Sequence, residues 1–203
     1  DMAVLQFMMT ALIVSMIGLY GLSALGLLQF PNIPGTYLVG NLIEGVPYTC
    51  GAEQGMTGRL GQFSYKTGDA CDFKVGKMVF AVTPAKLQKG YVSAYDLTAT
   101  DTEAWTLVAI LQSISYWRPG NNLMVVDNNL VARIPTVNLK DADGAVSAAL
   151  ATFKGTVTAV PVNSARILLA QTVNADNSLV IPLESLVAQG QATLNALQIA
   201  TVS

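Results

Sequence analysis

"DMAVLQFMMTALIVSMIGLYGLSALGLLQF" (residues 1–30) decides how this chain is organised, because no charged side chain follows Asp1 until Glu44. As a helix, Met2 to Leu28 would be about 40 Å long, which is enough to cross the hydrocarbon core of a bilayer. The sequence therefore predicts a long apolar N-terminal helix that meets a membrane at some stage.

The breaker cluster "PNIPG" (residues 31–35) is predicted to end this helix and turn the chain. A length of 203 residues accommodates one domain of ordinary size besides an appendage. We therefore expect an assembly or transmembrane helix over residues 1–30 and an extracellular domain over residues 31–203. Only 12% of the residues are charged, and Thr, Ser, Asn and Gln supply the polar surface, as is common in exported proteins that pack against their own copies.

The N-terminal stretch fits a simple secretion signal poorly, because it has no basic region and its apolar core is too long. It fits a permanent anchor only in part, because the first basic residue is Arg59. A start at Asp1 indicates that a short leader has been removed. We expect a helix that waits in the membrane and then joins a bundle of identical helices.

Small residues recur along one face of this predicted helix, at Ala11, Ser15, Gly18 and Gly21. Small side chains let helix backbones approach closely. The predicted assembly interface consists of Leu5, Ala11, Leu12, Ser15, Gly18, Leu19, Gly21, Leu22 and Leu25.

The same segment resembles the N-terminal helix of type IV pilin-like subunits, which also join an apolar helix to a globular domain. Bacterial type IV pilins typically begin with Phe or Met and carry Glu at the fifth position, whereas this chain has Asp1 and Leu5. The resemblance implies a structural subunit of an extracellular bacterial filament, a homopolymer with an inner-membrane intermediate.

Composition argues against several other functions. A net charge of −2 without a basic stripe argues against nucleic-acid binding. The absence of histidine removes the commonest metal ligand and general acid/base, so we expect no enzyme activity, cofactor or metal site. We interpret "KDADG" (residues 140–144) as a turn that starts a helix rather than as a calcium loop.

Cys50 and Cys71 are the two cysteines of the chain. In an oxidising compartment they would form a disulfide that stabilises the domain by roughly 3 kcal/mol. The alternative is a pair of buried free thiols. Because the preceding segment argues for export, we expect the disulfide.

The globular part is predicted to be α+β, mainly β with two or three short helices. A capping-box pair, Thr100 and Glu103, marks the start of the best-supported helix. Further elements are expected as follows: an extended segment at 38–46, a hairpin joining 63–65 to 73–75 across "KTGD", a second hairpin joining 123–126 to 130–134, a helix at 145–153, strands at 156–162, 167–173 and 179–183, and a strand or helix at 192–202.

Residues 45–115 resemble a module of bacterial exported and cell-surface proteins, which implies a location and says little about activity. The matching residues are Gly58, Gly61, Phe63, Tyr65, Gly68, Phe73, Val75, Gly76, Leu97, Ile110, Leu111 and Gln112. Core packing is expected for Trp105 and Trp117, with a sugar-binding platform of Tyr116 and Trp117 as the alternative.

The leading functional prediction is thus a pilin-like filament subunit, involved in adhesion or not, whose partners are its own copies and, before assembly, the membrane. The alternative is a membrane-anchored surface protein with an adhesive binding domain. An exported hydrolase is the weakest hypothesis, because no histidine and no nucleophile motif support it.

Overall fold

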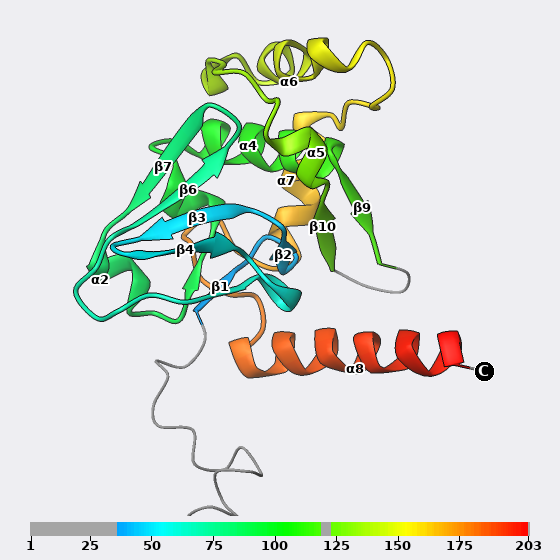
Figure 1. Cartoon of the computed structure of the whole chain (residues 1–203). Helices are drawn as coiled ribbons and strands as arrows, with labels where there is room; N and C mark the ends of the chain where they lie inside the picture. Colours follow the sequence, from blue (N-terminus) through cyan, green and yellow to red (C-terminus); the bar gives the residue numbers. More distant parts are fainter. Residues whose placement is uncertain (1–35, 119–122, 203) are drawn as a thin grey trace, which may run out of the picture. The chain divides into compact units, whose positions relative to one another are not determined.

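The computed structural model describes residues 36–118 and 123–202 (Figure 1). They form an α+β domain with three small sheets and several helices, which confirms the predicted class. The expectation of a mainly β domain with two or three short helices was wrong, because the C-terminal half is helical.

The strands are β1 (Thr36–Leu38), β2 (Ile43–Glu44), β3 (Pro47–Cys50), β4 (Glu53–Met56), β5 (Gln62–Phe63), β6 (Cys71–Val75), β7 (Met78–Val82), β8 (Tyr91–Val92), β9 (Ser115–Trp117) and β10 (Met124–Val126). The helices are η1 (Arg59–Gly61), α2 (Pro84–Leu87), α3 (Ala94–Leu97), α4 (Asp101–Ser113), α5 (Asn128–Val131), η2 (Leu139–Asp141), α6 (Asp143–Leu150), η3 (Ala151–Phe153), α7 (Val162–Ala170) and α8 (Leu183–Val202).

The largest sheet is antiparallel, with the strand order β4-β3-β6-β7 (Figure 1). Along β6, Cys71, Phe73 and Val75 are buried while the residues between them face outward, as the two-residue period of a strand requires. Phe73 meets Phe63 edge to face, with ring centroids 5.0 Å apart. This aromatic contact joins the four-stranded sheet to β5.

The predicted hairpin across "KTGD" does not form. A turn is present there, because the N–H of Asp69 donates to the carbonyl of Lys66 at 3.0 Å, but β5 pairs with β1 and β6 pairs with β3 and β7. The hairpin partner of β6 is the next strand, across Gly76 and Lys77. Gly76 has a φ of +61°, which glycine adopts without steric cost.

Helix α4 is the central helix of the core and begins where its capping box predicts. The N–H of Thr100 donates to Glu103 Oε2 at 2.9 Å, and the N–H of Glu103 donates to Thr100 Oγ1 at 3.3 Å. Its long buried side chains include Leu107, Ile110 and Leu111. The helix packs against α3, α6 and α7, so it joins helices from both halves of the domain.

Three expectations in the second half are corrected. Residues 128–131 form α5 instead of part of a hairpin, because Asp127 Oδ1 accepts the N–H groups of the first turn. Residues 162–170 form α7, whose buried residues are spaced as on one helix face, instead of strands over 156–162 and 167–173. At 179–183, Leu179 makes an isolated bridge to Val173 instead of belonging to a strand. Residues 192–202 belong to α8, which is one of the two alternatives expected for them.

The helix expected over 145–153 is confirmed as α6 followed by η3, and "KDADG" is the turn from which α6 starts.

The other two sheets have three strands each, in the orders β5-β1-β8 and β2-β10-β9. In the latter, β10 runs parallel to β2 and antiparallel to β9. This sheet brings Glu44 and Val125 side by side, although they are far apart in the sequence. One of its faces belongs to the core, and the other forms the floor of the cleft described below.

Candidate functional site

The predicted disulfide is confirmed. Cys50 and Cys71 lie directly opposite each other on β3 and β6, with Cα atoms 4.2 Å apart and an S–S bond of 2.01 Å. Both residues are fully buried. The bond therefore fastens two neighbouring strands of the largest sheet.

The residues predicted to form the assembly interface, from Leu5 to Leu25, lie outside the described residues. Among residues 36–118 and 123–202, no helix is long and apolar enough to cross a membrane.

A cleft of about 430 Å³ lies over the exposed face of the β2-β10-β9 sheet. Its floor is a cross-strand row, because Val125 pairs with Glu44 on one side and with Tyr116 on the other. The neighbouring row, which contains Trp117 and Met124, faces the opposite way. Tyr116 is 57% exposed, so its ring is available to a ligand.

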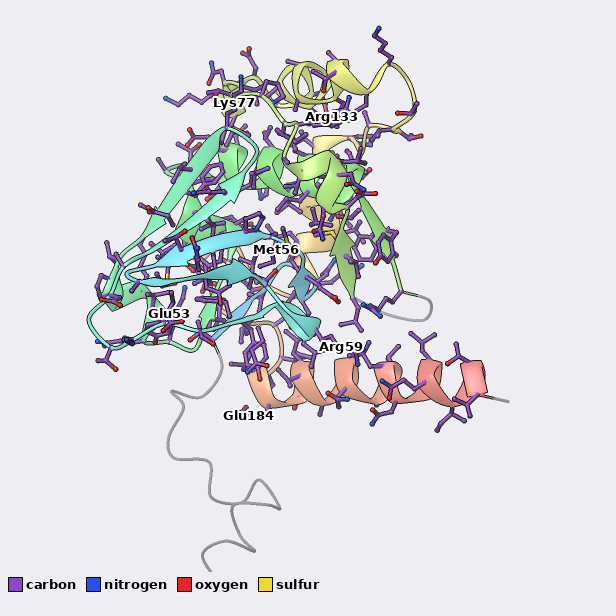
Figure 2. The ribbon with its side chains drawn as sticks, viewed as in Figure 1. Glu53, Met56, Arg59, Lys77, Arg133 and Glu184 are labelled. Carbon is purple, nitrogen blue, oxygen red and sulfur yellow. A yellow bond between two sulfur atoms is a disulfide. The ribbon has the colours of Figure 1, made fainter. Side chains whose placement is uncertain are left out.

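One wall of the cleft comes from the end of β4, where Met56 (labelled in Figure 2) and Thr57 lie. The buried Thr57 hydroxyl donates to the Ile43 carbonyl at 2.8 Å and accepts the N–H of Val46 at 2.9 Å. Gly45, between these strands, has a φ of +91°, and a Cβ there would lie 2.8 Å from the Val126 carbonyl oxygen. The Thr57 hydroxyl and the close approach of the backbone at Gly45 therefore hold this wall in place.

The opposite wall is Asp127, Asn128 and Asn129, at the start of α5. Asp127 uses Oδ1 to accept the N–H groups of Asn129 and Leu130, at 2.8 and 3.3 Å. Within the described part of the chain, the amide side chains of Asn128 and Asn129 and the hydroxyl of Tyr116 have no hydrogen-bond partner. The cleft thus offers several free donors and acceptors around one aromatic ring.

The charge of the cleft is modest and acidic. Glu44 Oε2 forms an ion pair with Arg118 Nη2 at 2.8 Å, and both side chains are largely buried. The residues that line the cleft include no lysine or arginine. An anionic ligand would therefore find no unpaired positive charge on the lining.

The structure separates the two aromatic residues of the predicted platform. Tyr116 lines the cleft, whereas Trp117 is on the other face of β9 and is still 38% exposed, so core packing of this tryptophan was wrong in part. Trp105 is partly buried against the core, as expected, and donates to the Tyr95 hydroxyl at 2.9 Å. The asparagines and Glu44 were missed, because no local pattern signals that these segments converge.

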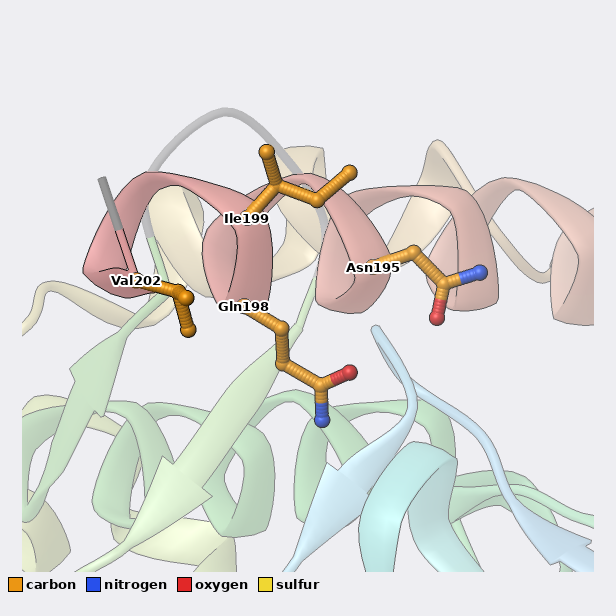
Figure 3. Close-up of a pocket in the computed structure, with 4 residues that line it drawn as sticks. All are labelled: Asn195, Gln198, Ile199 and Val202. Carbon is orange, nitrogen blue, oxygen red and sulfur yellow. The ribbon is translucent and has the colours of Figure 1, made fainter.

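A second exposed feature is the end of α8. After Glu184 this helix contains no charged residue, and beyond the buried Leu194 it presents Ile199 and Val202, which are 72% and 88% exposed. Asn195, Gln198, Ile199 and Val202 line a shallow pocket of about 530 Å³. Figure 3 shows Ile199 projecting from the side of the helix opposite Gln198. These four described lining residues all come from α8.

The buried carboxylate of Asp96 is fully used inside the domain. Its Oδ1 accepts Lys89 Nζ at 2.8 Å and Asn177 Nδ2 at 2.9 Å, while Oδ2 accepts the N–H of Ser93 at 3.0 Å. Tyr91 donates to the Asn177 carbonyl at 2.8 Å, and burial, with nearby carboxylates adding to it, raises the pKa of Tyr91. This network ties the cap of α3 to a distant turn.

No group of three or more potential metal ligands occurs among the residues with described positions. No family model matches the chain, and no curated protein or solved structure matches it either. The described residues form a disulfide-bonded α+β domain with an open polar cleft and an uncharged, exposed helix end.

Proposed function

We propose that this chain is the structural subunit of an extracellular bacterial filament, of the pilin-like kind, in which identical copies assemble through the N-terminal helix. The observation that carries the proposal is the uncharged stretch between Asp1 and Glu44, joined to a compact unit, Gly35–Ser203, with a core and a disulfide of its own. In such a chain the apolar segment would mediate assembly, and the folded domain would form the water-exposed surface of the filament.

Assembly follows from the cost of exposing the apolar segment. Each CH₂ group taken out of water stabilises by about 0.8 kcal/mol, so Met2 to Leu28 requires cover once it has left lipid. Helices of other copies supply that cover. Ala11, Ser15, Gly18 and Gly21 are proposed for the closest helix-to-helix contacts, because they are small.

The exposed end of α8 also supports assembly, because it offers a surface that other subunits could cover. Exposed apolar side chains on an uncharged helix are typical of an interaction surface rather than of a solvated face. Ile199 and Val202 provide such a surface here. In the proposed filament, a second copy of the chain covers this surface.

The disulfide and the resemblance of residues 45–115 to a module of exported proteins agree with an extracellular place for the domain. Disulfides persist in oxidising compartments. The membrane is the partner before assembly, and the filament at the cell surface is the final location.

The test uses the full chain in detergent, followed by detergent removal and negative-stain microscopy. The unmodified chain and Gly18→Ala, which keeps a small residue, are expected to form long fibres. Gly18→Leu is expected to shorten or abolish them, because a large side chain separates the helices while the segment stays apolar. Fibres that are equally long for Gly18→Leu would refute the proposed helix packing.

A membrane-anchored surface protein with a binding domain is the second candidate, and the cleft of the β2-β10-β9 sheet favours it. In that case the unmodified chain forms no fibres on detergent removal and is recovered in liposomes with the domain folded. That single result separates the two candidates.

A further inference from the structure

We propose that the cleft over the β2-β10-β9 sheet binds an uncharged carbohydrate. The ring of Tyr116 is the platform on which a sugar ring stacks, and the side chains of Asn128 and Asn129 supply hydrogen bonds from the opposite wall. The volume of about 430 Å³ falls within the roughly 300–1,000 Å³ of small-molecule sites.

The chemistry of the lining matches the two faces of a sugar. One side of a pyranose ring presents C–H groups, which pack against an aromatic ring, while its hydroxyls need both donors and acceptors. Tyr116 provides the apolar surface. Asparagine amides carry a donor and an acceptor on the same group, so Asn128 and Asn129 suit hydroxyls, which also have both functions.

The charges on the lining favour a neutral ligand over an anionic one. The nearby cation, Arg118, is paired with Glu44, and the lining itself contains no basic residue. A phosphate, sulfate or carboxylate group would thus face the Asp127 carboxylate without compensation. Sialylated and sulfated glycans are therefore excluded as preferred ligands.

The cleft is held in shape before any ligand arrives. Thr57 joins the loop before β3 to β2 through two hydrogen bonds, and Asp127 fixes the first turn of α5. Gly45 brings the backbone close to Val126 and places Asn128 Oδ1 within 3.4 Å of its would-be Cβ. A preformed site loses little entropy on binding, which suits the weak individual contacts of sugars.

The experiment probes the full chain in a detergent without sugar headgroups on an array of neutral and acidic oligosaccharides and unrelated peptides. Titration calorimetry then measures Kd for a neutral oligosaccharide that binds. Tyr116→Ala is expected to raise Kd about tenfold or more, because it removes an aromatic stacking contact. Tyr116→Phe, which keeps the ring, is expected to stay within about threefold of the unmodified chain.

Trp117→Ala is the matched control, because it removes the neighbouring aromatic ring on the opposite face of β9. It is expected to leave Kd unchanged. Asn128→Ala, which keeps the floor intact, is expected to raise Kd about fivefold and provides a second reading if Tyr116→Ala does not fold.

Three outcomes would overturn the inference: no binding to any neutral glycan, binding confined to acidic glycans or peptides, and neutral-glycan binding that Tyr116→Ala and Asn128→Ala both leave intact. The inference does not rest on filament formation, because the cleft lies within one domain. A chain that binds sugar without forming fibres would support the sugar site and refute the filament proposal. A chain that forms fibres without binding sugar would support the filament proposal and refute the sugar site.

Discussion

Replacing Gln112 with methionine tests whether the core of the domain carries an uncompensated polar group. Gln112 is on α4 and is 3% exposed, and its amide nitrogen and oxygen have no hydrogen-bond partner among the described residues. An unpaired buried amide costs about 1–3 kcal/mol. Methionine has a similar length and no polar hydrogen-bonding group of comparable strength, so Gln112→Met is expected to raise the free energy of unfolding by about 1–3 kcal/mol.

In a domain of this size, 1 kcal/mol corresponds to about 2–4 °C in Tm, so the expected rise is roughly 2–12 °C. Tryptophan fluorescence is a suitable probe for urea and thermal unfolding, because both tryptophans, Trp105 and Trp117, are in the domain. Gln189→Met, on the exposed side of α8, is the matched control and is expected to change stability by less than about 0.5 kcal/mol. A Gln112→Met variant that is less stable than the unmodified chain, with a neutral control, would show that the amide is satisfied and the reasoning wrong.

The remaining predictions concern the disulfide, one turn and one carboxylate. Replacing both cysteines with alanine is expected to lower the free energy of unfolding by about 3 kcal/mol, and a loss near zero in the same fluorescence assay would contradict the chain-entropy estimate. Gly76→Ala would place a Cβ 1.9 Å from the Ile134 carbonyl oxygen and is expected to cost more than about 3 kcal/mol, whereas Gly68→Ala, with nothing within 4 Å, is expected to cost about 1 kcal/mol; equal losses would argue against the close approach. The hydroxyl and N–H of Ser178 hold the pKa of Asp176 below its usual 3.8, so this group contributes stability above pH 3.8 that is lost as the pH falls through its folded pKa. In an NMR titration, Ser178→Ala is expected to raise the pKa of Asp176, because it removes the hydroxyl and keeps the backbone N–H. An unchanged pKa would exclude the Ser178 hydroxyl as a cause.

Local signals predicted the parts of the fold that local physics determines. The capping box at Thr100 and Glu103 located α4, because a cap needs residues only three positions apart. The pair of Cys50 and Cys71 was predicted correctly because no other partner exists in the chain. The turn before α6 was also predicted, because a turn, like a helix cap, depends on residues that are close together in the sequence.

The wrong predictions of secondary structure arose where contacts between distant segments, and not the local sequence pattern, decide the structure. Residues flanking "KTGD" alternate as strands do, but β6 is an interior strand and takes its partners from β3 and β7. The strands predicted over 156–162 and 167–173 rested on short aliphatic runs, although Val162, Ala165 and Leu169 recur with helical spacing. Short apolar runs of this kind fit both periods, and packing against α4 decides between them.

The candidate cleft was beyond prediction, because its floor requires a parallel pairing of Val125 with the distant Glu44 besides the antiparallel pairing of Val125 with Tyr116. Sequence patterns indicate that a strand exists, but not which distant strand lies beside it. The exposed ring of Tyr116 had been considered as part of a sugar platform, but together with Trp117, which the strand's alternation directs to the other face.

The cleft and the core depend on the same helix, and this links the two main experiments. Strand β9 starts directly after α4 and Ile114, and the Asp127 N–H donates to the Ile114 carbonyl at 3.0 Å, so α4 fixes both Tyr116 and the wall at α5. Gln112 lies on the same helix, but its side chain is inside the core. A conservative core change should therefore raise stability and leave sugar affinity unchanged, because a site on rigid elements responds to its own side chains. If Gln112→Met altered sugar affinity as strongly as Tyr116→Ala, α4 would have to shift with the core, and the cleft would not be preformed.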